Sequence, residues 1–255
     1  MRIIWDNLVD YSETVVTAGS EAADLPVSNI LHHHRTRVYR TGASSAAEYI
    51  LIDFGSARAV QALVLLDHTL TNSDSGLKLQ GNATNSWGSP SVDETLTFHA
   101  GTLAHFLSAA QTYRWWRISF TKSAAGESRD IGRVFLGPYY ECVKDISFGG
   151  LTIKPVDLSD TKKSLGGQTY SNPKDIYDEI DAEFGYILDA QMTAFRTIAA
   201  ATGTHTPFFI SCDPTSKPYD WLYYVKFAEF QAQKVEIYKS SLPMWSTRMK
   251  FEEQL

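Results

Sequence analysis

The sequence predicts a mainly β protein in which a β-sandwich or jelly roll is followed by an antiparallel β domain with one α-helix. Three observations lead to this fold class. Aromatic residues make up 13% of the 255 residues, which suits half-buried strands. The first half alternates short apolar runs with stretches of Gly, Asn and Ser, a pattern typical of sandwiches. The second half contains one long alternating run and one helical run.

Six runs in the first half have the length and alternation of strands. In YILIDFG, alternate residues from Ile50 to Phe54 share one face, and in AVQALVLLDH alternate residues from Val60 to Leu66 are expected to do the same. The later runs are LKLQGN, ETLTFHA, YRWWRISF and IGRVFLG. Within YRWWRISF, a strand places Trp116 in the core and Trp115 outside.

The second half predicts more strands around a single helix. ISFGGLTIKP and KSLGGQTYS indicate a strand pair with glycine turns, and TPFFISC, WLYYVKFAEFQAQ and STRMKFEE follow later. In DIYDEIDAEFGYIL the apolar side chains fall on even positions from Ile176 to Leu188, which predicts a long half-buried strand. We expect Asp189 to cap the following helix and Gly203 to end it.

Composition and spacing exclude several function classes. A formal net charge of -6 argues against a general nucleic-acid binder, because phosphate contacts need a basic face. No apolar run approaches the roughly 20 residues of a membrane span, and the first ten residues lack the layout of a signal peptide. Cys142 and Cys212 form no metal-binding spacing, so buried free thiols are expected. No cofactor and no metal site are predicted.

Four motifs in the first half carry a resemblance to a known family. YILIDFGSARAVQALVLL resembles the "W-I-x-I-D-L-G" strand pair of discoidin or coagulation factor 5/8 type C domains, with Tyr49 where the family usually has Trp. LKLQGNATNSW, YRWWRISF and IGRVFLG resemble three later motifs of the family, in the family's order. The resemblance implies a galactose-binding-like jelly roll over residues 1–141, with sugar binding at one end of the barrel.

The stretch HHHRTRVYR, residues 32 to 40, then falls in a long loop at that end of the barrel. Three consecutive histidines in an extended segment point alternately to opposite sides, so a shared metal ion is disfavoured. Solvated or inter-subunit loop residues are the first interpretation, and sugar contacts are the second. The carbohydrate-binding candidates are His33, Arg35, Arg37, Tyr39, Asn72, Asp74, Trp87 and Arg129.

Each of these candidates also has a purely structural interpretation. Asn72 and Asp74 are residues that make turns, since their side chains bond to nearby backbone. Trp87 is expected to cover the barrel end, and Arg129 to pair with a neighbouring acid. Taken singly, the structural interpretation is favoured for each.

The second half resembles the ring-forming domains of long-tailed bacteriophage tail and baseplate proteins over residues 146–255. The resemblance is architectural and depends on a sheet, one helix and a last strand that ends in KFEEQL. A jelly roll joined to such a domain is similar to a distal tail protein, although there the ring domain usually comes first. The implied function is a non-enzymatic structural part of a tail tip or baseplate, made in the host bacterial cytoplasm and located in the virion.

This resemblance implies particular partners. The chain is expected to assemble with itself into a hexameric ring, with a trimer as the alternative, and to contact tail tube and hub proteins and a host cell-surface saccharide. A closed ring needs two different surfaces. The interface candidates are an acidic strand face, Glu179, Asp181 and Glu183, and a distinct basic and aromatic one, Lys226, Lys234, Lys239, Trp245 and Arg248.

Two other functions stay open at this point. One is a soluble carbohydrate-binding module whose second domain is an accessory. The other is a hydrolase with an undetected site, which is disfavoured because the sequence contains no G-x-S-x-G, HExxH or phosphate-binding glycine motif. The acidic run DEIDAE is interpreted as an exposed strand face and not as a catalytic carboxylate pair.

Overall fold

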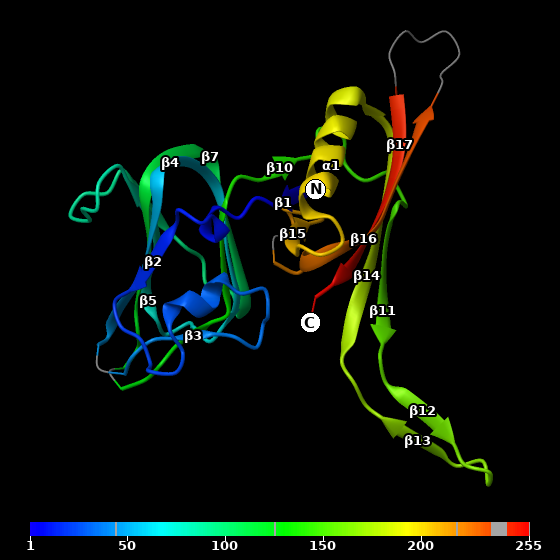
Figure 1. Ribbon diagram of the computed structural model, residues 1–255, viewed down its shortest axis with the longest axis horizontal. Helices are drawn as coiled ribbons and strands as arrows, with labels where there is room; N and C mark the ends of the chain where they lie inside the picture. The colour runs from blue at the N-terminus through cyan, green and yellow to red at the C-terminus, as the bar shows by residue number, and fades with distance from the viewer. Residues whose placement is uncertain (44, 125, 218, 236–243, 255) are drawn as a thin grey trace. The chain divides into compact units, whose positions relative to one another are not determined.

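The structure is a computed structural model that describes residues 1–43, 45–124, 126–217, 219–235 and 244–254. The chain divides into two compact units (Figure 1). We call Asp6–Tyr139, which is grouped with Lys217–Asp220, the sandwich domain. We call the unit formed by Met1–Trp5, Tyr140–Ser216 and Trp221–Leu255 the helix-bearing domain. The predicted fold class, a mainly β chain with a sandwich followed by an antiparallel sheet and one helix, is confirmed.

The sandwich domain contains a six-stranded sheet and a small two-stranded one. The strands of the larger sheet are β2 (Val15–Ala18), β4 (Ala47–His68), β5 (Ser75–Asn82), β6 (Val92–Thr95), β7 (Gly101–Thr121) and β9 (Arg133–Gly137). The smaller sheet pairs β3 (Tyr39–Arg40) with β8 (Asp130–Ile131), and two short 3-10 helices are η1 (Leu8–Asp10) and η2 (Val27–Leu31).

Two very long strands, β4 and β7, join the two layers of the sandwich. Near its start β4 pairs with β2 and with the end of β7, whereas its second part pairs with β9 and with the start of β7. The register of the β4–β7 pair shifts between Asp53 and Arg58, where both strands bend over the core. The core between the layers contains Ile50, Ile52 and Trp116, all fully buried, as predicted.

The alternation predicted for AVQALVLLDH is wrong after its first residue. A further register shift in β4 lies between Val60 and Ala62, so Val60, Leu63 and Leu65 belong to the core cluster. The even-numbered residues that follow Val60 point to the other face, where they are buried as well. Because a bulge adds one residue to a strand, it exchanges the two faces for every residue beyond it.

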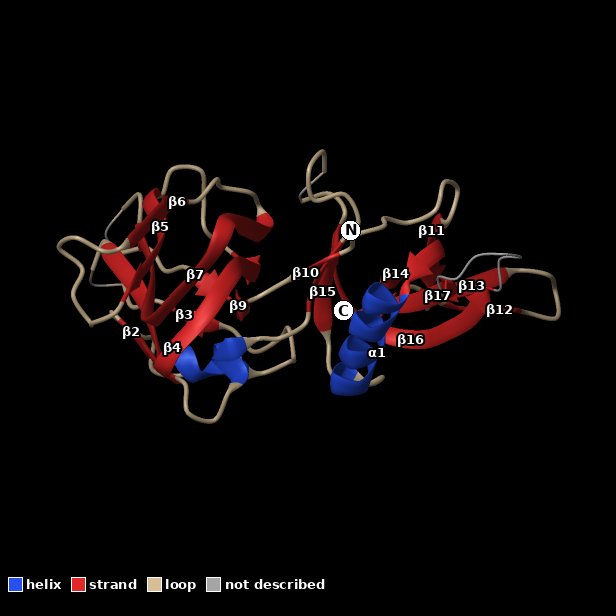
Figure 2. Ribbon diagram, turned by 90° about the horizontal axis from the view of Figure 1, so that it is seen from above, coloured by secondary structure: helices blue, strands red, loops and turns tan. Residues whose placement is uncertain are grey.

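The helix-bearing domain is a seven-stranded sheet with a helix on one face (Figure 2). Its strand order is β10 (Tyr140–Glu141), β1 (Arg2–Ile4), β15 (Phe208–Ser211), β16 (Leu222–Val235), β17 (Met244–Glu253), β14 (Ile176–Leu188) and β11 (Leu151–Asp157). Neighbouring strands in this order run antiparallel to each other. Among the described residues, no helix is long and apolar enough to cross a membrane.

Strand β1 changes the predicted domain organisation. It lies between β10 and β15, with Ile3 opposite both Tyr140 and Ile210. The sandwich domain is therefore inserted between two neighbouring strands of the other sheet. The predicted first domain, residues 1–141, is wrong at both ends, because residues 1–5 and 140–141 belong with the predicted second domain, residues 146–255. The start and the end of the inserted segment lie side by side. A side chain at position 137 would clash with the carbonyl oxygen of Asp6, so this position requires glycine.

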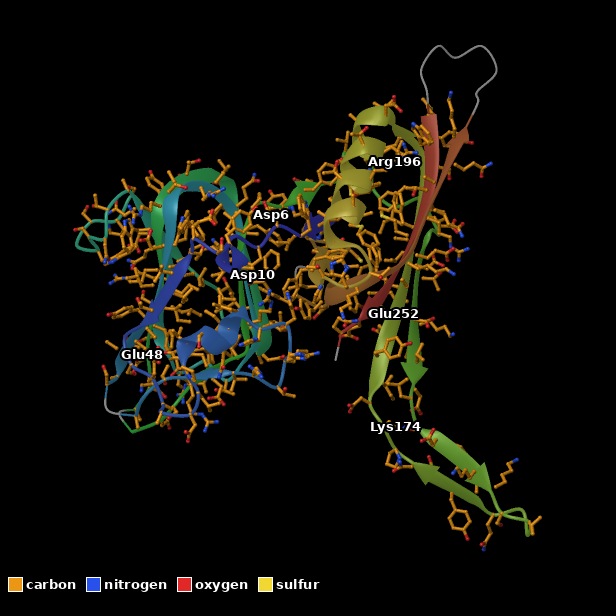
Figure 3. The ribbon with its side chains drawn as sticks, in the orientation of Figure 1. Asp6, Asp10, Glu48, Lys174, Arg196 and Glu252 are labelled. Atoms are coloured by element: carbon orange, nitrogen blue, oxygen red, sulfur yellow. The ribbon has the colours of Figure 1, made fainter. Side chains whose placement is uncertain are left out.

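Helix α1 (Asp189–Thr202) covers one face of this sheet through Met192, Phe195 and Ile198, as predicted. Gly203 ends the helix with a φ of 54°, a conformation that glycine adopts readily. The capping prediction for Asp189 is wrong, because Leu188 is the N-cap residue and Asp189 is the first helical residue. The Asp189 carboxylate instead accepts a hydrogen bond from Nε1 of Trp245, and Arg196 (labelled in Figure 3) stacks on the same indole.

Strand β14 follows the predicted alternation only from Ile180 to Phe184, and Ile176, which was expected inside, is 57% exposed. Its register against β17 shifts between Phe184 and Ile187, and Tyr186 has a φ of 55°. Beyond this bulge Ile187 is fully buried, while Tyr186 and Leu188, which were expected inside, are exposed. The predicted inward positions Ile180, Ala182 and Phe184 are buried.

The two strands β12 (Asp160–Lys163) and β13 (Thr169–Asn172) form a separate two-stranded sheet at the far end of β11 and β14 (Figure 1). All eight of their residues are exposed. We call residues 158 to 175 the hairpin arm. Lys174, at its base in Figure 3, pairs with Asp160 at 2.8 Å.

Candidate functional site

Four loops of the sandwich domain meet at one end of the sandwich. Backbone hydrogen bonds tie them together, from Thr41 to Arg129, from Thr69 to Asp130 and from Lys122 to Ala46. We call this end, which includes residues 20, 41–43, 69–74 and 122–130 where described, the loop end.

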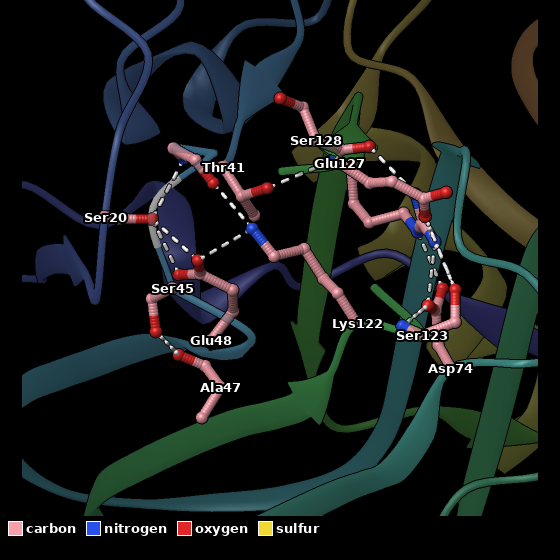
Figure 4. A network of polar contacts seen from close by, with 12 residues as sticks. Ser20, Thr41, Ser45, Ala47, Glu48, Asp74, Lys122, Ser123, Glu127 and Ser128 are labelled. Carbon is pink, nitrogen blue, oxygen red and sulfur yellow. Dashed lines mark hydrogen bonds and ion pairs between the residues drawn. The ribbon is translucent and has the colours of Figure 1, made fainter. Parts of the chain in front are cut away.

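A buried ion pair holds the first of these loops. Nζ of Lys122 lies 3.2 Å from the carboxylate of Glu48, and both side chains are fully buried. Nζ also donates to the Gly42 carbonyl at 2.6 Å, and the Ser20 hydroxyl lies 2.8 Å from both oxygens of Glu48 (Figure 4). These bonds satisfy both charges within the protein, so the pair has a structural role.

A second buried ion pair involves two of the predicted candidates. Arg129 donates two hydrogen bonds to Asp74, at 2.7 and 2.9 Å, and a third to Glu127 (Figure 4). Burial alone would raise the pKa of Asp74, but the bonds from Arg129 and from the backbone N–H groups of Thr71 and Ser123 hold that pKa well below its usual range. The hydrogen bond to Asp74 raises the pKa of Arg129. Both side chains therefore fix the loops, as their structural interpretation predicts.

A small cavity opens beside this pair. Its volume is about 200 Å³. Its apolar lining includes Phe98 and Phe120, and its polar lining includes Thr71, Asn72 and Thr95. The other lining residues are Leu70, Asp74, Gly76, Leu77 and Leu96. Asn72 and Thr95 are exposed, Phe98 is half-buried and Phe120 is buried, so the polar groups lie at the opening and an aromatic ring lies deeper.

The histidine-rich loop does not form a common site. Tyr39 is fully buried in the core, and its hydroxyl donates to the Ser20 carbonyl at 2.7 Å, so its assignment to sugar binding is wrong. Burial raises the pKa of this hydroxyl. Arg35 forms a two-bond ion pair with Asp67, and Arg37 bonds to the His32 ring at 3.2 Å. His33 is exposed.

Trp87 lies at the opposite end of the sandwich from Asp74 and Arg129. It follows Asn82, which pairs with Trp115 near the bend of β7, whereas Ser75 at the other end of the same strand pairs with Thr121. The Arg117 guanidinium stacks on Trp87 with 4.7 Å between its carbon and the ring centre. Of the predicted saccharide candidates, the structure places only Asn72 and Asp74 together in the loop-end cavity.

Sequence reasoning missed Phe98 and Thr95 as lining residues. ETLTFHA was expected to form one strand, but β6 ends at Thr95, and Phe98 lies in the segment that follows. The available signal was the turn-forming stretch TNSDSG, residues 71–76, which runs into the start of β5, the pairing partner of β6. A turn facing the end of a neighbouring strand is a place where a cavity forms.

The two predicted assembly surfaces overlap in part. Arg248 on β17 lies opposite Glu183 on β14 and donates to Asp181 on the same sheet face, with 2.8 Å between Nε and Oδ1. Because β14 and β17 are neighbours, Arg248 and the acidic residues form one mixed face, whereas Trp245 contacts helix α1 on the other face of the sheet. Glu179 pairs with Lys154 at 3.7 Å, and Lys234 on β16 lies opposite Trp245. Lys226 lies opposite Glu252 on the mixed face, and Lys239 lies outside the described residues.

The described part of the chain holds no group of three His, Cys, Asp or Glu side chains that could bind a metal ion. Cys142 and Cys212 are free thiols at the core of the helix-bearing domain. Burial raises the pKa of each thiol to about 12, so both are protonated and unreactive near neutral pH.

Comparison with known proteins gives structural similarity for about half of the chain. A chitosan-binding module of a chitosanase/glucanase from Paenibacillus sp. IK-5 is 18% identical and covers 52% of this chain and 99% of its own, with a TM-score of 0.42. The family 32 carbohydrate-binding module of NanJ from C. perfringens, in complex with galactose, is 14% identical over 55% of this chain and 100% of its own (TM-score 0.41).

A fucose-binding module from Streptococcus pneumoniae is 12% identical over 52% of this chain and 94% of its own, with a TM-score of 0.42. The N-terminal half of the chain is thus similar to carbohydrate-binding modules. No family model and no curated protein matches the sequence.

Proposed function

We propose that the sandwich domain is a saccharide-binding module that binds one sugar residue in the loop-end cavity, without catalysis. The observation that carries this proposal is the lining of the cavity, which combines the aromatic ring of Phe98 with the hydroxyl and amide groups of Thr71, Asn72 and Thr95. A pyranose ring has an apolar C–H face and a rim of hydroxyls. Aromatic rings bind the first, and amides and hydroxyls bind the second.

The loop-end ion pair supports this function by holding the cavity open before a ligand arrives. Asp74 lines the cavity, and its two oxygens accept bonds from Arg129 and from the backbone of Thr71 and Ser123. The turn that carries Asn72 is therefore fixed in the free protein. Binding to such a preformed site costs less conformational entropy than binding that must order a loop.

The direct test is isothermal titration calorimetry of the whole chain with galactose, fucose and glucosamine, the sugars suggested by the names of the similar modules. We expect binding of at least one sugar, and we expect Asn72→Ala to weaken it about tenfold, as the loss of one or two hydrogen bonds predicts. Asn172→Ala, which removes the same amide from the exposed hairpin arm, is the matched control. Failure of every sugar to bind at millimolar concentration, or equal effects of the two variants, contradicts the proposal.

We propose a second function for the helix-bearing domain, assembly of the chain into a ring of the kind found in phage tail tips and baseplates. The observation that favours assembly is the hairpin arm, in which Leu165 is fully exposed and Tyr170 is 61% exposed. Isolated two-stranded hairpins have marginal stability in water, and apolar side chains that protrude in this way favour burial against a partner.

Electron microscopy and light scattering test the second function. A six-fold ring, or a three-fold one as the alternative, is expected either free in solution or on an assembled particle. Leu165→Asp should prevent ring formation and leave the fold unchanged, whereas Lys163→Asp on the neighbouring exposed position should have a smaller effect because it removes no apolar contact. A particle that contains the chain only in monomeric, peripheral positions contradicts this proposal.

A further inference from the structure

A second surface of the sandwich domain, remote from the loop-end cavity, also has the chemistry of a binding site. It lies on the outward side of the β2–β4–β7–β5 layer, since Ile50, Ile52 and Trp116 of the same strands point into the core. Four of its residues lie on the outward side of β4 and β7, and Trp87 stacks on one of them, Arg117. We call Tyr49, Leu51, Trp87, Trp115 and Arg117 the outer aromatic face.

The register of the strands brings these side chains together. Leu51, Arg117 and Gln80 lie opposite one another in one row across three strands. The next row toward the bend contains Asp53, Trp115 and Asn82. In an antiparallel sheet, residues in one row and residues two apart on one strand point to the same side. Trp115 is therefore a direct neighbour of Arg117.

Both tryptophans of this face are held in place by arginines. Arg117 stacks on Trp87 at 4.7 Å, and Nε1 of Trp87 donates to Asn85 at 2.7 Å. Arg114 stacks on Trp115 at 5.1 Å and forms a two-bond ion pair with Asp53. Rigid aromatic side chains lose little entropy when a ligand stacks on them.

Arg117 differs from Arg114 in its partners. Its guanidinium donates to the amide oxygen of Gln80, at 2.8 and 2.6 Å, and no carboxylate forms an ion pair with it within the described part of the chain. The nearby carboxylate of Asp93 already accepts bonds from Lys78 and from Gln80. Arg117 is half-buried, so its charge is partly removed from water, and this burial lowers its pKa. A partly dehydrated guanidinium gains most from a carboxylate that binds it.

We propose that the outer aromatic face binds a saccharide chain that carries a carboxylate, with a sugar ring against Trp115 and the carboxylate on Arg117. Tryptophan provides the apolar surface for the C–H face of a sugar, and Ser119 on the same outward side provides a hydroxyl for hydrogen bonds to the sugar. The charge on Arg117 selects an acidic sugar over a neutral one. The overall charge of -6 disfavours nucleic acid as the occupant.

Calorimetry of the whole chain with trigalacturonic acid and with a neutral galactose trisaccharide tests the proposal. The acidic trisaccharide should bind at least about tenfold more tightly, the worth of one charge-assisted hydrogen bond. Arg117→Gln should remove this preference, and Trp115→Ala should abolish binding of both trisaccharides to this face. Added salt should lower the affinity for the acidic trisaccharide more than the affinity for the neutral one.

Two matched controls separate this site from others. Trp221→Ala removes a half-exposed tryptophan of the helix-bearing domain and should leave the affinity unchanged. Asn72→Ala should also leave the binding of trigalacturonate unchanged, and loss of its binding in this variant would assign the acidic sugar to the loop-end cavity and overturn the proposal. Equal affinity for the two trisaccharides, no binding at millimolar concentration, or a dimer that dissociates on Trp115→Ala would overturn it as well.

Discussion

At the level of single residues, the loop end depends on charges that are removed from water. Lys122 and Glu48 are fully buried and 3.2 Å apart, and their other bonds go to Gly42 and Ser20. Transferring each ion out of water costs several kcal/mol, so neither charge is tolerated without its partner. Such a pair fixes geometry more than it adds stability.

Lys122→Met should lower the free energy of unfolding of the sandwich domain by about 3–5 kcal/mol, because it leaves the Glu48 carboxylate buried without a counter-ion. The double variant Lys122→Met, Glu48→Leu should recover much of that loss. Urea unfolding followed by fluorescence measures both. Lys162→Met on the exposed hairpin arm is the control, and a loss below about 1 kcal/mol for Lys122→Met, the range of an exposed pair, would show that the pair is hydrated.

His68 makes the stability of the sandwich domain depend on pH. It is 5% exposed, and neither ring nitrogen makes a hydrogen bond within the described part of the chain. Burial lowers its pKa, and the nearby backbone of His99 offsets only part of this effect. The unfolded chain, with a histidine pKa of about 6.5, therefore binds more protons below that pH than the folded chain does.

The free energy of unfolding should consequently be constant above about pH 7.5 and fall as the pH decreases below about 6.5. His105, whose pKa is also lowered by burial, adds to the same slope. Urea midpoints measured from pH 8 to pH 5 should show a smaller slope in His68→Leu, whereas His34→Leu on the exposed loop should keep the original slope. A slope unchanged by His68→Leu would mean that His68 binds protons equally in the folded and unfolded states.

At the level of secondary-structure elements, single added residues decide which side chains are buried. The bulge in β14 exchanges the two faces of the strand after Phe184, so Ile187 packs in the core beneath helix α1 while Leu188 points outward. Nothing in an alternating sequence marks the position of such a bulge. The residue that forms it, Tyr186, has a positive φ that a tyrosine seldom adopts.

Two alanine variants of adjacent residues measure this effect. Ile187→Ala should lower the free energy of unfolding by about 2–5 kcal/mol, because it leaves a cavity in a packed core. Leu188→Ala should change it by less than about 0.5 kcal/mol, as expected for an exposed side chain. Chemical unfolding of both variants under the same conditions gives the comparison, and the reverse order of the two losses would place the bulge elsewhere.

Patterns in the sequence predict the local elements and fail where distant segments decide. The periodicity located most strands and the single helix, and the burial of Trp116 followed from alternation alone. The bulges after Val60 and Phe184 were not predictable, because either strand could continue in phase without them. The candidate site was predictable only in part. Turn residues such as Asn72 and Asp74 mark the loops at the end of the sandwich, but the sequence does not show that Asp74 forms an ion pair with Arg129.

At the level of the whole molecule, the two domains differ in how they depend on the continuity of the chain. Every residue of the sandwich core lies between Leu8 and Leu136. The core of the helix-bearing domain uses Met1 and Ile3 together with residues beyond 140. The core of the sandwich domain therefore comes from one continuous segment, whereas the core of the helix-bearing domain is assembled from two separate segments.

A fragment of residues 6–139 should fold on its own, and a fragment that begins at Tyr140 should not, because its sheet lacks the strand between β10 and β15. Circular dichroism and the cooperativity of thermal unfolding test both fragments. Adding a peptide of residues 1–6 should restore part of the order in the second fragment. Cooperative unfolding of residues 140–255 alone would show that β1 is dispensable.

The position of β1 also affects synthesis on the ribosome. Arg2–Ile4 leaves the ribosome about 200 residues before its neighbour β15, which begins at Phe208. At 5–20 residues per second, the first strand waits roughly 10–40 s for that partner. During this interval the sandwich emerges complete and can fold, while β1 still lacks its β15 partner. Strand β1 is thus among the last elements to be fully paired, and a chaperone that shields a short apolar strand would act in that interval.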